Sequence, residues 1–204
     1  MSNPKTPATS ILTTEEIMAE FPLVFDGQVH TMPGEKFHIS LTADARPFCV
    51  TAPRTIPFAY RDKLKKEIDL LESQGIITPI TEPTEWCAPT VVTLKKNSDR
   101  IRMCVDLSKL SKFVRQERYP VSDITQSKAK YFTVFDALKG YHQCHLDEES
   151  QKLTTFITPF GSYKYLRAPY RISSISEHYN RRMDQTFAGL DDFRKIVDDC
   201  HFRQ

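Results

Sequence analysis

The sequence predicts an α+β fold, because helical and strand-like patterns mix along the chain without strict alternation. The clearest helical pattern covers 61–74, where apolar residues recur every three to four positions and Gly75 is placed to end the helix. Two β-rich runs, 90–94 and 101–105, flank a short polar stretch and predict a hairpin. These patterns favour α+β over a doubly wound parallel sheet.

The composition is that of a globular protein and excludes a wholly disordered chain. Of 204 residues, 40% are hydrophobic, 11% aromatic and 26% charged, which suits one domain, or one domain with a short arm. No apolar stretch approaches the roughly 20 residues of a membrane span, and no secretory signal begins the chain. We therefore expect no membrane segment and an intracellular protein, cytoplasmic or also nuclear, that is not secreted. The five cysteines are scattered and fit a reducing compartment.

Residues 1–60 are predicted to form an N-terminal arm or linker. The first twelve residues are rich in Ser, Thr and Pro, and Thr13 with Glu16 matches a capping box that opens a helix running to about Glu20. From 21 to 57, short strand-like runs are broken by Pro and Gly, which favours an extended arm over a domain with its own core. The domain proper is expected to cover 61–204.

The remaining elements are expected in the following order. Asp147, Glu148 and Glu149 are interpreted as a solvated turn. Strands are predicted from 76, at 133–135, at 152–158, at 163–166 and at 194–197, and a helix is predicted at 174–187.

Basic residues are concentrated between 95 and 118. This segment holds eight Lys and Arg but only three acidic residues, whereas the whole chain carries a net charge of only +2. Such a local stripe suits contact with phosphates. A solvated hairpin would show the same charges, and the stripe alone does not separate these two interpretations.

Carboxylates follow two apolar strand-like segments. Asp136 ends the run from 131 to 135, and Asp198 and Asp199 follow Ile196 and Val197. A carboxylate at the end of an apolar strand is costly to bury unless it is paired or binds a cation. Such carboxylates could hold two Mg²⁺ ions about 4 Å apart, as in-line nucleotidyl transfer requires. Asp pairs are also common at turns, so the carboxylates alone leave the metal site open.

The ordered set of motifs resembles the reverse transcriptase domain of gypsy-type LTR-retrotransposon Pol polyproteins. The resemblance covers roughly residues 20–200. Each motif is weak alone, but their order and spacing together are specific. The matching runs are 71–77, 87–92, 95–96, 102–107 and 119–120 in the fingers, and 132–143, 152–156, 160–165 and 197–199 in the palm.

The resemblance implies a fold of reverse-transcriptase-like fingers and an incomplete palm, the palm being a ferredoxin-like split βαβ unit, with the thumb absent. It implies an RNA-directed DNA polymerase that uses two Mg²⁺ ions, with dNTPs and an RNA or DNA template-primer as partners. Asp136, Asp198 and Asp199 would be the catalytic metal ligands. The oligomeric state is not implied.

The resemblance also implies a nucleotide-binding set. Lys95 and Arg102 would grip the incoming triphosphate from the fingers hairpin, since an Arg fork and a Lys point charge both suit phosphate. Tyr141 would lie under the sugar and exclude a 2′-hydroxyl. Arg171 would add bulk and charge at a position where the family usually has Gly.

Three departures from the family pattern predict an impaired polymerase. Arg171 replaces Gly, Ser176 replaces the Pro before a helix, and Ile196 replaces the Tyr before the Asp pair. We also expect the second arm of the active-site hairpin, after Asp199, to be missing, which would leave a strand edge unpaired. The alternatives are a catalytically dead nucleic-acid-binding remnant of a mobile element, or another palm-like enzyme such as a nucleotidyl cyclase.

Overall fold

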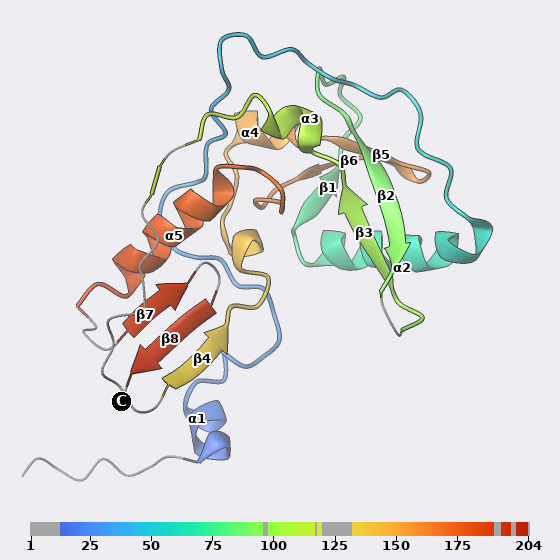
Figure 1. Cartoon of the computed structure of the whole chain (residues 1–204). Coiled ribbons are helices and arrows are strands. Elements are labelled where there is room, and N and C mark those ends of the chain that lie inside the picture. The colour runs from blue at the N-terminus through green and yellow to red at the C-terminus, as the bar shows by residue number, and fades with distance from the viewer. Residues whose placement is uncertain are drawn as a thin grey trace, which may run out of the picture.

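The computed structural model describes residues 13–95, 98–116, 118–119, 132–189, 193–196 and 199–203, and of the strand residues 132–136, 193–196 and 199–203 it describes the backbone. The fold is α+β, as the sequence predicts. Figure 1 shows two separate sheets, linked by the short helix η1 and by the long N-terminal arm.

The helices and strands follow the expected order closely. The helices are α1 (Thr14–Glu20), α2 (Phe58–Ser73), α3 (Ser108–Ser111), η1 (Gly140–Gln143, a 3₁₀ helix), α4 (Glu148–Leu153) and α5 (Ile175–Thr186). The strands are β1 (Ile77–Pro79), β2 (Ala88–Leu94), β3 (Ile101–Val105), β4 (Phe132–Asp136), β5 (Phe156–Thr158), β6 (Gly161–Tyr165), β7 (Phe193–Ile196) and β8 (Asp199–Arg203). Across the described ranges, no helix is long and apolar enough to cross a membrane.

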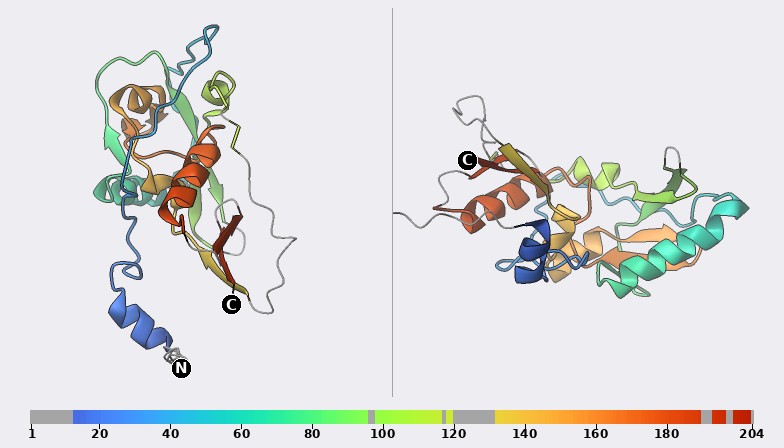
Figure 2. Two further views of the ribbon diagram at one scale, coloured as in Figure 1. Left: turned by 90° about the vertical axis from the view of Figure 1, so that its left-hand side faces the viewer. Right: turned by 90° about the horizontal axis from the view of Figure 1, so that it is seen from below.

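The larger sheet has five strands in the order β1-β6-β5-β2-β3. All its pairs are antiparallel except β2 with β5, which run parallel. The smaller sheet has three antiparallel strands in the order β4-β8-β7, and α5 lies beside it (Figures 1 and 2).

Helix α2 forms because its apolar residues recur along one face. Leu64, Ile68 and Leu71 lie on that face and are buried, and the helix packs against β3 and β1. Gly75 follows with a φ of 61°, a left-handed conformation that glycine adopts without strain, and it turns the chain into β1. The predicted helix and its stop signal are confirmed.

The N-terminal arm is extended and packs along the domain. Helix α1 opens with the predicted capping box between Thr13 and Glu16 and buries none of its residues, and Figure 2 shows it at one end of the molecule. Further on, Phe37 and Ile39 enter the core, and the Phe37 amide donates to the His145 carbonyl at 2.7 Å. Apolar residues of the arm are therefore part of the core of the domain. A domain boundary at residue 60 stays a prediction, and α2 begins just before it.

The predicted strand at 152–158 is wrong in its first half, and so is the solvated turn before it. Residues 148–153 form α4, and only 156–158 form a strand. The helix forms because the Asp147 carboxylate caps it, accepting from the Ser150 amide at 2.8 Å. Two glutamates in the first turn also complement the helix dipole.

The expected loss of the second hairpin arm is also wrong. Residues 199–203 form β8, which pairs with both β7 and β4, so β8 is the central strand of its sheet. Ile196 and Asp199 are opposite each other in the antiparallel pair of β7 and β8. The five residues of β8, the first of which is Asp199, are enough for this pairing.

Burial of Phe37 predicts that the arm contributes to stability. Phe37 is only 4% exposed, so Phe37→Ala should lower the free energy of unfolding by about 3–5 kcal/mol in urea titrations. Phe58→Ala is the matched control, because Phe58 is 87% exposed and its loss should change stability by less than about 0.5 kcal/mol. Equal effects of the two substitutions would contradict this assignment.

Candidate functional site

The strand register places the backbone of two of the three predicted catalytic residues opposite each other. Asp136 is the last residue of β4 and lies opposite Asp199, the first residue of β8. Opposite residues of an antiparallel pair have Cα atoms about 4.5–5.5 Å apart. Asp198 falls outside the described residues.

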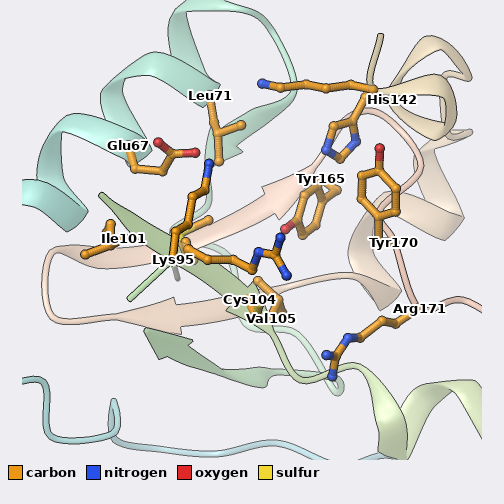
Figure 3. A pocket seen from close by; sticks show the side chains of 13 residues that line it. Glu67, Leu71, Lys95, Ile101, Cys104, Val105, His142, Tyr165, Tyr170 and Arg171 are labelled. Carbon is orange, nitrogen blue, oxygen red and sulfur yellow. The ribbon is translucent and has the colours of Figure 1, made fainter. Parts of the chain in front are cut away.

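A cleft of about 700 Å³ lies between the fingers hairpin, α2 and the segment after β6. Figure 3 shows the side chains around it. Four cationic side chains line the cleft, those of Lys95, Arg102, Lys139 and Arg171. One carboxylate, that of Glu67, also lines it. The structure therefore gathers three of the four predicted nucleotide-binding residues in one cleft. Its other lining residues are Leu71, Ile101, Met103, Cys104, Val105, His142, Tyr165 and Tyr170.

The hairpin of β2 and β3 presents two of these cations. Thr93 pairs with Arg102 in the ladder, and just beyond β2 the Lys95 amide donates to the Arg100 carbonyl at 2.9 Å. Both cationic side chains are exposed. Among the described residues, neither forms an ion pair, so both are available to an anionic ligand.

Two non-glycine residues in the described part of the chain have a left-handed backbone, and both line the cleft. They are Lys139, with a φ of 47°, and Arg171, with a φ of 73°. This conformation costs a side-chain-bearing residue about 1–2 kcal/mol, and such strain gathers at functional sites. It also explains why Gly suits the position of Arg171 in the family.

Tyr141 lies against the wall of the cleft as part of an aromatic cluster. Its ring centroid is 5.1 Å from that of Tyr170, which lines the cleft, and 5.5 Å from that of Tyr179. Gly140 makes room for this cluster, since a Cβ there would lie 2.9 Å from the Tyr179 Oη. The structure thus places Tyr141 beside the cleft, although Tyr141 is not one of the residues that line it.

His142 and Lys139 line the cleft and were missed by sequence reasoning. The buried His142 ring donates from Nδ1 to the Ala168 carbonyl at 3.0 Å, and burial lowers its pKa to about 4. The Lys139 ammonium donates to Gln74 Oε1 at 3.1 Å. Both residues lie inside the motif run 132–143, but that run does not indicate that they line a cleft.

Depression of the His142 pKa predicts a pH-dependent stability. An unfolded His titrates near 6.5, so between pH 6.5 and 4 the unfolded chain binds more protons than the folded one. The free energy of unfolding should therefore fall by up to about 3 kcal/mol as the pH drops through that window. Burial is the main cause, and the nearby charges of Lys139 and Arg167 add to it.

The control for this prediction is His142→Asn, whose side-chain amide can still donate to the Ala168 carbonyl but does not titrate. Urea titrations at several pH values should show a shallower pH dependence for the variant than for the wild type. Identical slopes would show that His142 does not titrate as its burial implies.

Backbone strain at Arg171 gives a second prediction. Arg171→Gly should be more stable than Arg171→Ala by about 1 kcal/mol, because only glycine adopts a φ of 73° at no steric cost. Both substitutions remove the same charge, so the difference between their urea midpoints isolates the backbone. An alanine variant as stable as the glycine variant would argue against strain.

No family model matches the chain, but retrovirus-related Pol polyproteins are among its relatives. The chain is 30% identical over 180 residues to the retrovirus-related Pol polyprotein from transposon opus of Drosophila melanogaster, which covers 82% of this chain and 18% of that protein. It is 31% identical over 153 residues to the Pol polyprotein from transposon gypsy of the same species, covering 70% of this chain and 14% of the relative. The chain therefore spans less than a fifth of these relatives.

Solved structures of the same fold include foamy viral protease-reverse transcriptases. A prototype foamy virus protease-reverse transcriptase matches with a TM-score of 0.81 and 19% identity, over 93% of this chain and 26% of that one. A foamy viral protease-reverse transcriptase in complex with an RNA/DNA hybrid matches with a TM-score of 0.78 and 17% identity, over 95% of this chain and 27% of that one. With motif order, sequence relatives and fold in agreement, the chain is a reverse-transcriptase-like domain that belongs to the retrotransposon Pol polyprotein family.

Proposed function

We propose that this chain carries the nucleotide-binding and metal-binding parts of an RNA-directed DNA polymerase. The observation that carries the proposal is that cations from separate motifs meet in one cleft. Lys139 of that cleft follows Asp136 by only three residues, so their Cα atoms are at most about 11 Å apart. Phosphate-binding cations and metal-binding carboxylates would thus act on one bound nucleotide.

The cleft would hold the triphosphate of a dNTP. Arg102 and Arg171 offer planar forks that match phosphate oxygens, and Lys95 and Lys139 offer point charges. Because the cations outnumber the single carboxylate of Glu67, the cleft favours a ligand with several negative charges. Tyr141, held beside the cleft by its aromatic neighbours, would restrict space at the sugar and disfavour a 2′-hydroxyl.

The carboxylates would hold two Mg²⁺ ions. Asp136 and Asp199 lie opposite each other in the ladder, and Asp198 directly precedes Asp199 in the sequence. Carboxylate oxygens are hard ligands that suit Mg²⁺. When bound, the metal pair would activate the attacking hydroxyl and stabilise the leaving pyrophosphate.

The template and primer would be the macromolecular partners. The related foamy viral enzymes have been solved in complex with dsDNA and with an RNA/DNA hybrid, and this chain shares their fold. The basic residues between 95 and 118 provide charge for contacts with the nucleic-acid backbone. We expect such binding to weaken steeply with salt.

We still propose that turnover is impaired, now because of two residues, Arg171 and Ile196. The second arm of the active-site hairpin is present as β8, so its loss no longer argues for impairment. Arg171 still places a charged, strained residue where the family usually has Gly. Ile196 still replaces Tyr before the Asp pair. A remnant that binds nucleic acid without turnover is the alternative that these two residues favour.

Nucleotide binding should depend on the cleft cations. Lys95→Ala, Arg102→Ala and Arg171→Ala should each weaken the binding of dGTP with Mg²⁺ roughly tenfold, since each removes a charged hydrogen bond. Isothermal titration calorimetry measures this directly, and the losses should shrink at high salt because the side chains are exposed. Lys66→Ala, an exposed site on α2, is the control. Unchanged affinity in all three variants would remove the cleft from the proposal.

Polymerisation should depend on the paired carboxylates. We expect slow extension of a DNA primer on an RNA template with dNTPs and Mg²⁺. Asp136→Asn and Asp199→Asn should lower the rate at least about 100-fold, because each removes a metal ligand. Asp62→Asn, an exposed carboxylate on α2, should extend like the wild type. Salt-dependent binding of the template-primer with no extension would favour the non-catalytic remnant instead.

A further inference from the structure

Two cysteines far apart in sequence are neighbours where the arm meets the fingers. Cys49 of the arm and Cys87, just before β2, form an isolated parallel β-bridge. The Cys87 amide donates to the Phe48 carbonyl at 2.9 Å, and the Val50 amide donates to the Cys87 carbonyl at 3.0 Å. These two bonds on either side of Cys49 fix the register of the pair.

The bridge places the two thiols within reach of each other. Neighbouring strands lie about 4.8 Å apart, which falls within the Cα separation of roughly 4.4–6.8 Å that a disulfide spans. The Cys49 side chain also contributes to the raised pKa of the Cys87 thiol. Both cysteines are free thiols in this structure, so the site is a preformed dithiol.

The two thiols differ in access. Cys49 is exposed, whereas Cys87 is buried. Burial, together with the charge and hydrogen bond of Cys49, raises the pKa of the Cys87 thiol to about 11. An oxidant from solvent therefore meets Cys49 first, and Cys87 can react only with a partner that Cys49 has already captured.

We propose that Cys49 and Cys87 form a redox modification site that takes a small-molecule disulfide such as oxidised glutathione. The Cys49 thiolate attacks one sulfur of glutathione disulfide and releases one glutathione thiolate, which leaves a mixed disulfide on Cys49. The Cys87 sulfur then attacks the Cys49 sulfur, gives up its proton and releases the second glutathione. Two protein thiols are oxidised and one small disulfide is reduced to two thiols.

The resulting bond would tie the arm covalently to the fingers. Besides the two backbone hydrogen bonds of the bridge, that contact includes exposed side-chain interactions, namely Arg54 with Asp106 at 3.3 Å and the Lys109 ammonium 5.8 Å from the Phe48 ring centroid. Because β2 leads directly from Cys87 into the cleft hairpin, oxidation would stiffen the base of the cation-bearing strand pair.

Peptide mapping of the full chain tests the proposal. The reduced protein is incubated with excess oxidised glutathione and digested with trypsin without reduction. Residues 37–54 and 67–95 form tryptic segments that each hold a single cysteine of the pair. We expect these segments to appear linked, lighter by two hydrogen atoms than their sum, and we expect the melting temperature to rise reversibly on oxidation.

Variants separate the two chemical steps. Cys87→Ser should accumulate a stable glutathione adduct on Cys49, Cys49→Ser should leave Cys87 unmodified, and Cys104→Ser should form the link like the wild type. A wild-type protein that keeps glutathione on Cys49 without forming the link would overturn the proposal. A link from Cys49 to any other cysteine, or no reaction at all, would also overturn it.

Discussion

The cleft depends on the hydrogen bonds that the Arg167 guanidinium donates to three separate segments of the chain. This guanidinium donates to the carbonyls of Gly75 at 3.1 Å, Val29 at 2.7 Å and His142 at 3.3 Å. These carbonyls belong to the turn after α2, to the arm and to η1, and buried carbonyls need such donors. One side chain, two residues after the end of β6, thereby links these three segments. Partial burial lowers the pKa of Arg167 from its ordinary value, but an arginine stays charged.

The cleft lies where elements end and meet, and this explains its chemistry. Lys95 follows β2, Lys139 precedes η1 and Arg171 lies between β6 and α5, so three of the four cations stand just beyond the ends of elements, and Arg102 lies within β3. Two of them are held in a left-handed conformation, which the surrounding packing must sustain. The aromatic cluster of Tyr141 and the buried His142, whose lowered pKa keeps it neutral near pH 7, lie beside these cations.

Local patterns predicted most of the fold and failed where a distant partner or a side-chain cap decided the outcome. The capping box at Thr13, helix α2 and the hairpin of β2 and β3 depend on contacts within a few residues, so their signals are visible in the sequence. The β-branched run around Thr154 was interpreted as strand, whereas the Asp147 cap draws the preceding residues into α4. Strand β8 was not predicted; it pairs with its sequence neighbour β7, and its central place in the sheet depends on β4, more than sixty positions away, for which no local pattern exists.

The sequence by itself determined the chemistry of this protein: the order of its motifs, the carboxylates at strand ends and the cations of the fingers hairpin. Residue type and spacing are enough for these, because chemistry belongs to the side chain. The tertiary structure alone decided which of them meet. It paired Asp136 with Asp199, gathered Lys95, Arg102 and Arg171 in one cleft, and added Lys139 and His142, whose role no local pattern indicates. Proximity across the chain arises from register and burial, which depend on the whole fold.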